Sequence, residues 1–157
     1  MKSMMTPIRK NLIQYYPNYH RITEYTASLH TVLALIARIY VAKIFFMSGL
    51  TKIQDWDTTL FLFEEEYQVP FLPADLAAYL GTAGELIFPI LLLIGMASRF
   101  SALALSVVNI VAVVSLADIA PAALYLHIIW GMLLTYVVLY GAGTLSLDRW
   151  IKHALLK

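Results

Sequence analysis

Long apolar runs separated by short polar stretches dominate the pattern of this chain. Four such runs lie at about residues 29–50, 75–96, 100–118 and 122–142. A helix of about 20 apolar residues crosses the roughly 30 Å hydrocarbon core of a bilayer. No stretch of about ten residues alternates between apolar and polar positions as a membrane β-strand does. The pattern therefore predicts an all-α membrane protein whose core is a bundle of four transmembrane helices.

The polar segments divide the chain into three parts. Residues 1–28 form a polar N-terminal extension, residues 29–142 the transmembrane domain, and residues 143–157 a tail. Apolar side chains recur in the tail at helical spacing, as in an amphipathic helix that lies in the membrane interface. The extension has two interpretations that stay open: an interfacial segment anchored by its tyrosines, or a poorly ordered tail.

The connection at residues 51–74 is acidic and carries aromatic residues before its acidic run. It predicts either a short amphipathic helix on the bilayer or a lid over the end of the bundle. This connection has a single basic residue, Lys52, whereas the extension, the turn at Arg99 and the tail together hold most of the others. Because basic residues concentrate in cytoplasmic segments, both termini are expected in the cytoplasm.

The composition agrees with a membrane protein and excludes several kinds of site. The 157 residues are 61% hydrophobic and 13% charged, against about 25% charged in soluble domains. A net charge of +1 gives no reason to expect a nucleic-acid partner. The absence of cysteine excludes disulfides, iron–sulfur clusters, thiolate zinc sites and covalent haem. No histidine pair matches in depth, so no haem is predicted, and no metal-binding spacing is present.

Ionisable residues inside the apolar runs are the first candidates for function, because charges in a membrane interior are costly. Counting about 1.5 Å per residue places Arg38, Glu85 and Asn109 near the midplane. Neighbouring antiparallel helices could then join Arg38 and Glu85 in a charge-assisted pair. That pair either fixes helix register or belongs to a polar cavity, and the residues alone leave both open.

A second polar set falls in the outer half of the bundle by the same count. It consists of Lys43, Tyr79 and His127, and Trp130 follows His127 on the fourth run. Arg38 and Lys43 are five residues apart, which turns them roughly 140° from each other around a helix. Trp130 is suited either to the core or to an aromatic wall against a flat ligand.

Three segments of the chain carry a resemblance to a known family. They read ARIYVAKIFFMSGLTKI, GTAGELIFPILLLIGMASRFSAL and GAGTLSLDRW. Their distinguishing residues are Arg38, Gly49, Lys52, Glu85, Gly95, Arg99, Gly141, Gly143, Ser146 and Asp148. Over about residues 35–150 the chain resembles the DoxX family of small four-helix bacterial membrane proteins.

The resemblance implies an inner-membrane protein of respiratory or oxidative-stress context. Some members of the family are subunits of quinone-linked sulfur oxidation, and others are membrane partners of soluble redox proteins. Arg38, Lys52, Glu85 and Arg99 match positions of the family pattern, and the resemblance makes these four residues candidates for the site.

The main functional hypothesis is an accessory redox subunit that binds a quinone, or a similar hydrophobic molecule, in a polar cavity of the bundle. Glu85 is the candidate for handling a proton, no catalytic residue is assigned, and no metal site is expected. The expected partners are the lipid bilayer, an oxidoreductase and a second copy of the chain. The alternatives are a non-enzymatic membrane scaffold that recruits a redox partner, and a small transporter. The candidate ligand-binding residues are Arg38, Lys43, Lys52, Tyr79, Glu85, Arg99, Asn109, His127 and Trp130.

Overall fold

The structure is a computed structural model that describes the backbone of residues 5–156 and the side chains of Tyr25 and residues 28–156. Within this range the chain is helical and contains no strand, which confirms the predicted all-α class. The helices are α1 (Met5–Gln54), α2 (Trp56–Glu65), α3 (Ala74–Ile94), α4 (Ser98–Val114), α5 (Pro121–Tyr140) and α6 (Leu147–Leu155).

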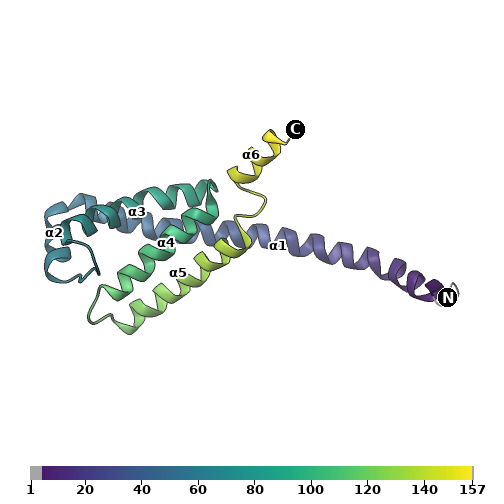
Figure 1. The fold of residues 1–157 in the computed structure, drawn as a ribbon, viewed down its shortest axis with the longest axis horizontal. Helices are drawn as coiled ribbons and strands as arrows, with labels where there is room; N and C mark the ends of the chain where they lie inside the picture. Colours follow the sequence, from purple (N-terminus) through teal and green to yellow (C-terminus); the bar gives the residue numbers. More distant parts are fainter. Residues whose placement is uncertain (1–4, 157) are drawn as a thin grey trace.

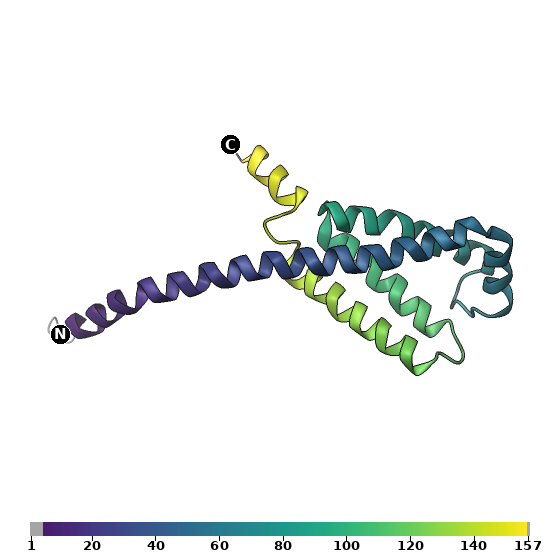
Figure 2. The ribbon, with the colours of Figure 1, turned by 180° about the vertical axis from the view of Figure 1, so that it is seen from behind.

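The second half of α1 packs with α3, α4 and α5 into a bundle (Figure 1). α1 contacts α3 and α5, and α4 also contacts both of these helices. The first half of α1 continues away from the bundle without a break, so that α1 is one long helix from the N-terminal side to α2 (Figure 2). The tyrosines of the predicted extension lie outside the described side chains, except Tyr25, which is exposed.

The predicted apolar runs correspond to α1, α3, α4 and α5. Ser28–Gln54, Ala74–Ile94 and Pro121–Tyr140 are each long and apolar enough to cross a membrane. α4 is a shorter apolar helix of 17 residues. Large apolar side chains remain exposed on the outer faces of the bundle, as a lipid-facing surface requires. The chain is therefore a transmembrane protein.

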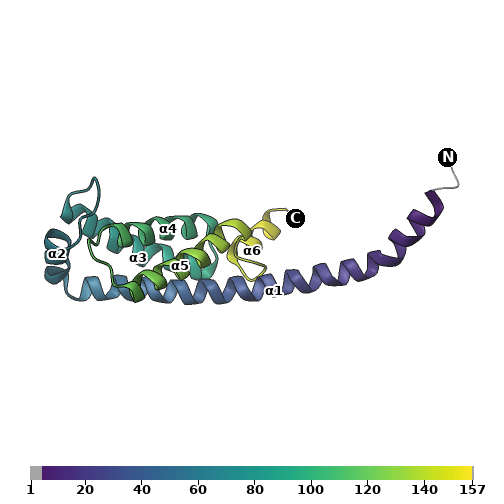
Figure 3. The same ribbon diagram turned by 90° about the horizontal axis from the view of Figure 1, so that it is seen from below.

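The two ends of the bundle differ. α2 crosses one end, here called the lid end, and α6 leaves from the opposite end, here called the terminal end (Figure 3). The core between them is apolar and includes Val41, Leu92, Leu105 and Leu134. The tight approach of α1 to α3 depends on Gly49, where an added Cβ would lie 2.9 Å from the Leu86 side chain.

α2 forms a lid over the bundle, which is one of the two predicted arrangements for the acidic connection. Asp55 begins the helix as its N-cap, because its carboxylate accepts a hydrogen bond of 3.0 Å from the backbone N–H of Thr58. Phe63 is buried against Ala77 and Ala78 of α3. Phe63 therefore packs α2 against α3, whereas Phe61 on the same helix is exposed.

Candidate functional site

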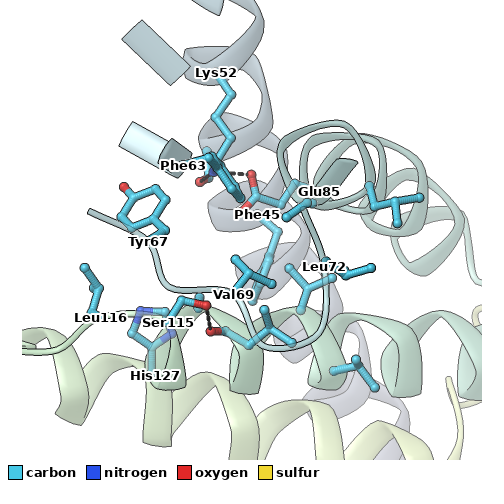
Figure 4. A pocket seen from close by; sticks show the side chains of 18 of the residues that line it. Phe45, Lys52, Phe63, Tyr67, Val69, Leu72, Glu85, Ser115, Leu116 and His127 are labelled. Carbon is cyan, nitrogen blue, oxygen red and sulfur yellow. Dashed lines mark hydrogen bonds and ion pairs between the residues drawn. The ribbon is translucent and has the colours of Figure 1, made fainter. Parts of the chain in front are cut away.

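A cavity of about 440 Å³ lies beneath the lid. Four helices of the bundle, α2 and the segment 66–73 all contribute to its wall. That segment is held to the end of α4 by a 2.8 Å hydrogen bond from the Gln68 N–H to the Ser115 carbonyl. Most of the lining is apolar, and Phe45 and Phe63 are among the larger side chains in it. Figure 4 shows the polar exceptions on different sides of the cavity.

The first polar group of the cavity is an ion pair between α1 and α3. Lys52 Nζ lies 2.5 Å from Glu85 Oε2 and also donates to Ser48 Oγ at 3.0 Å. Glu85 is buried and Lys52 is half-buried. Lys52 is about one helical turn beyond Gly49, where α1 approaches the Leu86 and Glu85 side chains of α3 closely, so its ammonium reaches the Glu85 carboxylate. The predicted pairing of Glu85 with Arg38 is wrong, because the partner of Glu85 is Lys52.

Arg38 lies at the terminal end instead of the midplane. Its side chain is 1% exposed and donates to four backbone carbonyls. Nε and Nη2 bind the carbonyls of Leu92 and Leu93 at 2.8 and 2.6 Å. Nη1 binds those of Ala142 and Leu145 at 3.0 and 2.8 Å. Arg38 thus joins the end of α3 to the segment after α5.

The depth prediction for Arg38 failed for a simple reason. It counted from residue 29, where the apolar run begins, but α1 starts long before this point and passes the terminal end as a continuous helix. The Leu92 carbonyl also accepts from the Gly95 N–H at 3.2 Å. Carbonyls in the last turn of a helix lack the usual donor four residues on, so those of Leu92 and Leu93 provide a strong site for a guanidinium.

The second polar group of the cavity is formed by α4 and α5. Asn109 Nδ2 donates to the backbone carbonyl of His127 at 2.9 Å, and Asn109 Oδ1 lies 2.8 Å from His127 Nδ1. The imidazole of His127 lines the cavity and meets the Trp130 ring edge-on, with ring centroids 4.8 Å apart. Asn109 and His127, which the depth count placed in two different polar sets, therefore lie in contact, and Trp130 forms part of the same wall.

Trp130 has an unusual feature in this wall. Its indole N–H is buried and has no hydrogen-bond acceptor within the part of the chain that the structure describes. A buried donor without an acceptor costs about 1–3 kcal/mol. Phe45 packs against the same ring, with centroids 6.0 Å apart, so the ring itself is held in place.

Besides Arg38 and Asn109, three predicted site residues do not line the cavity. Lys43 is exposed on α1 beside an apolar groove. Tyr79 is 58% exposed and its ring packs on Trp56, with centroids 4.7 Å apart. Arg99 is exposed and donates to the Leu139 carbonyl at 3.3 Å, which places it at the terminal end. Their depth or motif positions did not show which face of each helix they occupy.

The sequence did not single out the contributions of α2 and the segment 66–73. Tyr67 lines the cavity and meets Phe63 edge-on, with ring centroids 5.0 Å apart. Burial, followed by the charges of Glu66 and Glu85, raises the pKa of Tyr67, so its phenol stays protonated at neutral pH. The aromatic and acidic composition of this segment was the available signal, but its packing direction depends on the turn at residues 66–73.

The motif after α5 has a structural role at the terminal end. Asp148 accepts hydrogen bonds from the N–H groups of Ala97 and Ser98 at 2.7 and 2.9 Å, and from Ser98 Oγ at 2.7 Å. Burial raises the pKa of Asp148, but these hydrogen bonds and the charge of Arg38 outweigh it and hold the pKa below its usual range. The carboxylate therefore caps the start of α4 and joins it to α6.

The glycine before α4 explains how these contacts fit together. Gly95 ends α3 with φ +73°, a left-handed conformation that favours glycine. An added Cβ would lie 2.6 Å from Arg38 Nη2 and 2.7 Å from Ser146 Cβ. Arg38, Gly95 and Asp148 thus belong to one anchor at the terminal end, whereas Lys52 and Glu85 belong to the cavity.

Among the described residues, no group of three or more histidine, aspartate and glutamate side chains could hold a metal ion. The polar groups of the cavity are instead suited to hydrogen bonding, with a cationic donor at Lys52 and an imidazole at His127.

Comparison with known proteins supports the resemblance seen in the sequence. The DoxX family model matches residues 33–118. A protein of Haemophilus influenzae, described as uncharacterized, is 38% identical over 127 residues, which cover 75% of this chain and 82% of the relative. No solved structure matches the chain. The chain belongs to the DoxX family, and the matched region includes both Arg38 and the Lys52–Glu85 pair.

Proposed function

We propose that this DoxX-family membrane protein binds a quinone, or a similar flat hydrophobic molecule, in the cavity beneath α2. The observation that carries the proposal is a mostly apolar cavity of about 440 Å³ with an ion pair in its wall, in which Glu85 is buried and Lys52 half-buried. Sites for small molecules commonly measure about 300–1,000 Å³ and combine apolar walls with a few polar groups. A membrane-dissolved molecule with an apolar body and oxygen substituents fits this description.

The polar groups supply the orientation of the ligand. Lys52 is tied to α1 through Ser48 and to α3 through Glu85, so its ammonium is held in a fixed position. A ligand oxygen beside this ammonium gains a charge-assisted hydrogen bond that is strong where water is scarce. Glu85 is the group placed to exchange a proton with that oxygen. His127 and Trp130 form a further part of the wall, suited to packing against a ring.

In this proposal the protein is an accessory subunit and not the source of electrons. The chain has no cysteine, so it offers no thiol couple of its own. An oxidoreductase partner supplies or takes the electrons, and the bundle holds the quinone for it. The protein resides in the bacterial inner membrane with both termini in the cytoplasm, and the lid end faces outward, because basic residues collect on the terminal side.

The experiment that tests the proposal is quantitative mass spectrometry of small molecules extracted from the purified protein. The wild type should carry about one quinone-like molecule per chain. Ala112→Trp fills the cavity from α4 and should lower that amount about tenfold or more. Ile110→Trp, at an exposed position two residues earlier on the same helix, serves as the matched control and should retain the ligand.

Equal and low amounts of bound molecule in the wild type and in Ala112→Trp would contradict the proposal. Equal and high amounts would also contradict it, because the molecule would then be bound elsewhere.

A further inference from the structure

The contact between Asn109 and His127 decides which ring nitrogen carries a proton. Asn109 Nδ2 donates to the His127 carbonyl, so the amide is oriented with its oxygen toward the ring. An amide oxygen only accepts hydrogen bonds, so His127 Nδ1 must be the donor across this 2.8 Å contact. A neutral imidazole has a single N–H, and its Nε2 is therefore left with a lone pair.

The second nitrogen of the His127 ring, Nε2, can accept a hydrogen bond. His127 lines the cavity, and the structure shows no hydrogen-bond partner for its Nε2 among residues 28–156. The ring cannot turn to hide this nitrogen without breaking the contact with Asn109 and the edge-on contact with Trp130. A ligand that covers this half-buried ring without offering a donor leaves the acceptor unpaired beside apolar walls, which costs free energy, so a donor from the ligand is favoured there.

We infer that the ligand presents a hydroxyl group to His127 Nε2. This inference rests on the proposed function and narrows the ligand class to phenols and hydroquinones, as opposed to molecules whose only polar groups are carbonyl or ether oxygens. A carbonyl oxygen at the same position would face the Nε2 lone pair and repel it. A hydroquinone satisfies both polar groups of the cavity, because one oxygen can accept from Lys52 while the other donates to His127. Asn109 is then a positioning residue for His127.

The test uses two redox-inert probes that differ only in the donor, 2-bromo-4-decylphenol and its methyl ether, 2-bromo-4-decylanisole. Bromine quenches indole fluorescence at contact distance. The full-length protein in lipid nanodiscs carries Trp56→Phe and Trp150→Phe, so Trp130 in the cavity wall is its only tryptophan. Quenching of Trp130 is measured against the mole fraction of each probe in the lipid.

The phenol should reach half-quenching at about a tenfold lower mole fraction than the ether, which corresponds to about 1.4 kcal/mol. His127→Phe keeps an aromatic ring and should bind the two probes equally. Asn109→Leu frees the ring from its fixed orientation and should reduce the preference while both probes still bind. Circular dichroism checks that each variant retains its helices, and Asn109→Leu serves as the test if His127→Phe does not fold.

The outcomes distinguish a failure of this inference from a failure of the proposed function on which it rests. Equal binding of the two probes to the wild type, or a preference that survives in His127→Phe, overturns the hydroxyl inference and leaves a cavity that binds hydrophobic molecules. Binding of neither probe overturns both.

Discussion

Replacement of Arg38 by methionine should destabilise the bundle severely. The substitution removes all four hydrogen bonds from the guanidinium to backbone carbonyls at the terminal end. The bonds to the Leu92 and Ala142 carbonyls are buried, so water cannot readily replace them. At about 1.5–3 kcal/mol for each bond to a charged group, these two alone predict a loss of about 3–6 kcal/mol in the free energy of unfolding. Arg38→Lys keeps the charge without the planar fork and should lose about half as much.

The assay is unfolding by titration with sodium dodecyl sulfate in mixed micelles, followed by circular dichroism. Lys43→Met is the matched control, because Lys43 is an exposed cation on the same helix and has no hydrogen bond among the described side chains. Its free energy of unfolding should stay within about 0.5 kcal/mol of the wild type. An Arg38→Met protein as stable as Lys43→Met would refute the structural role assigned to Arg38.

Three further changes test other parts of the structure. Gly95→Ala should lower the free energy of unfolding by about 1–3 kcal/mol more than Gly81→Ala in the same titration. The methyl group added at Gly95 would lie 2.6 Å from Arg38 Nη2, whereas at Gly81 the nearest atom would be 3.6 Å away. The wild type should lose stability as the pH falls below about 4. The pKa of Asp148 is depressed in the folded protein, so its carboxylate stabilises the fold only while it is ionised. Asp148→Asn should show a smaller loss of stability in acid, and an equal loss would contradict the role of Asp148 as the cap of α4. Phe63→Ala should cost about 3–5 kcal/mol and accelerate hydrogen exchange in α2, because Phe63 is the buried aromatic contact of α2 with α3. Unchanged exchange would show that this side chain does not hold α2.

The all-helical fold could be predicted from the sequence because the bilayer imposes long apolar runs that are visible without any tertiary information. The helices α3 and α5 begin and end within about two residues of the predicted runs. The family could also be recognised, since the motifs around Arg38 and Glu85 lie within the region that the family model matches.

The pairing of the charged residues could not be predicted in the same way. Depth counts assume that an apolar run begins where the bundle begins, and α1 violates that assumption by continuing past the terminal end as one helix. The error moved Arg38 toward Glu85 and left Lys52 outside the span, although Lys52 is the residue that reaches Glu85. Asn109 and His127 were placed at different depths by the count, yet the facing surfaces of α4 and α5 bring them into contact.

The residues that line the cavity could be predicted even less well, because their positions depend on tertiary structure. Phe63 and Tyr67 contribute through α2 and the segment that follows it, and their direction is set by a turn that no helical period describes. Sequence patterns locate helices, but the turns between them decide which faces meet.

The measurement that tests the central claim most directly compares bound small molecules in two purified variants by mass spectrometry. Lys52→Met/Glu85→Leu removes the cavity ion pair as a unit, which avoids leaving one charge buried alone. Arg38→Lys alters the terminal end, where the structure shows an anchor and no cavity contact. The double variant should lose its bound molecule about tenfold or more relative to the wild type, and folded Arg38→Lys protein should retain it. Retention by the double variant together with loss in Arg38→Lys would contradict a ligand site beneath the lid.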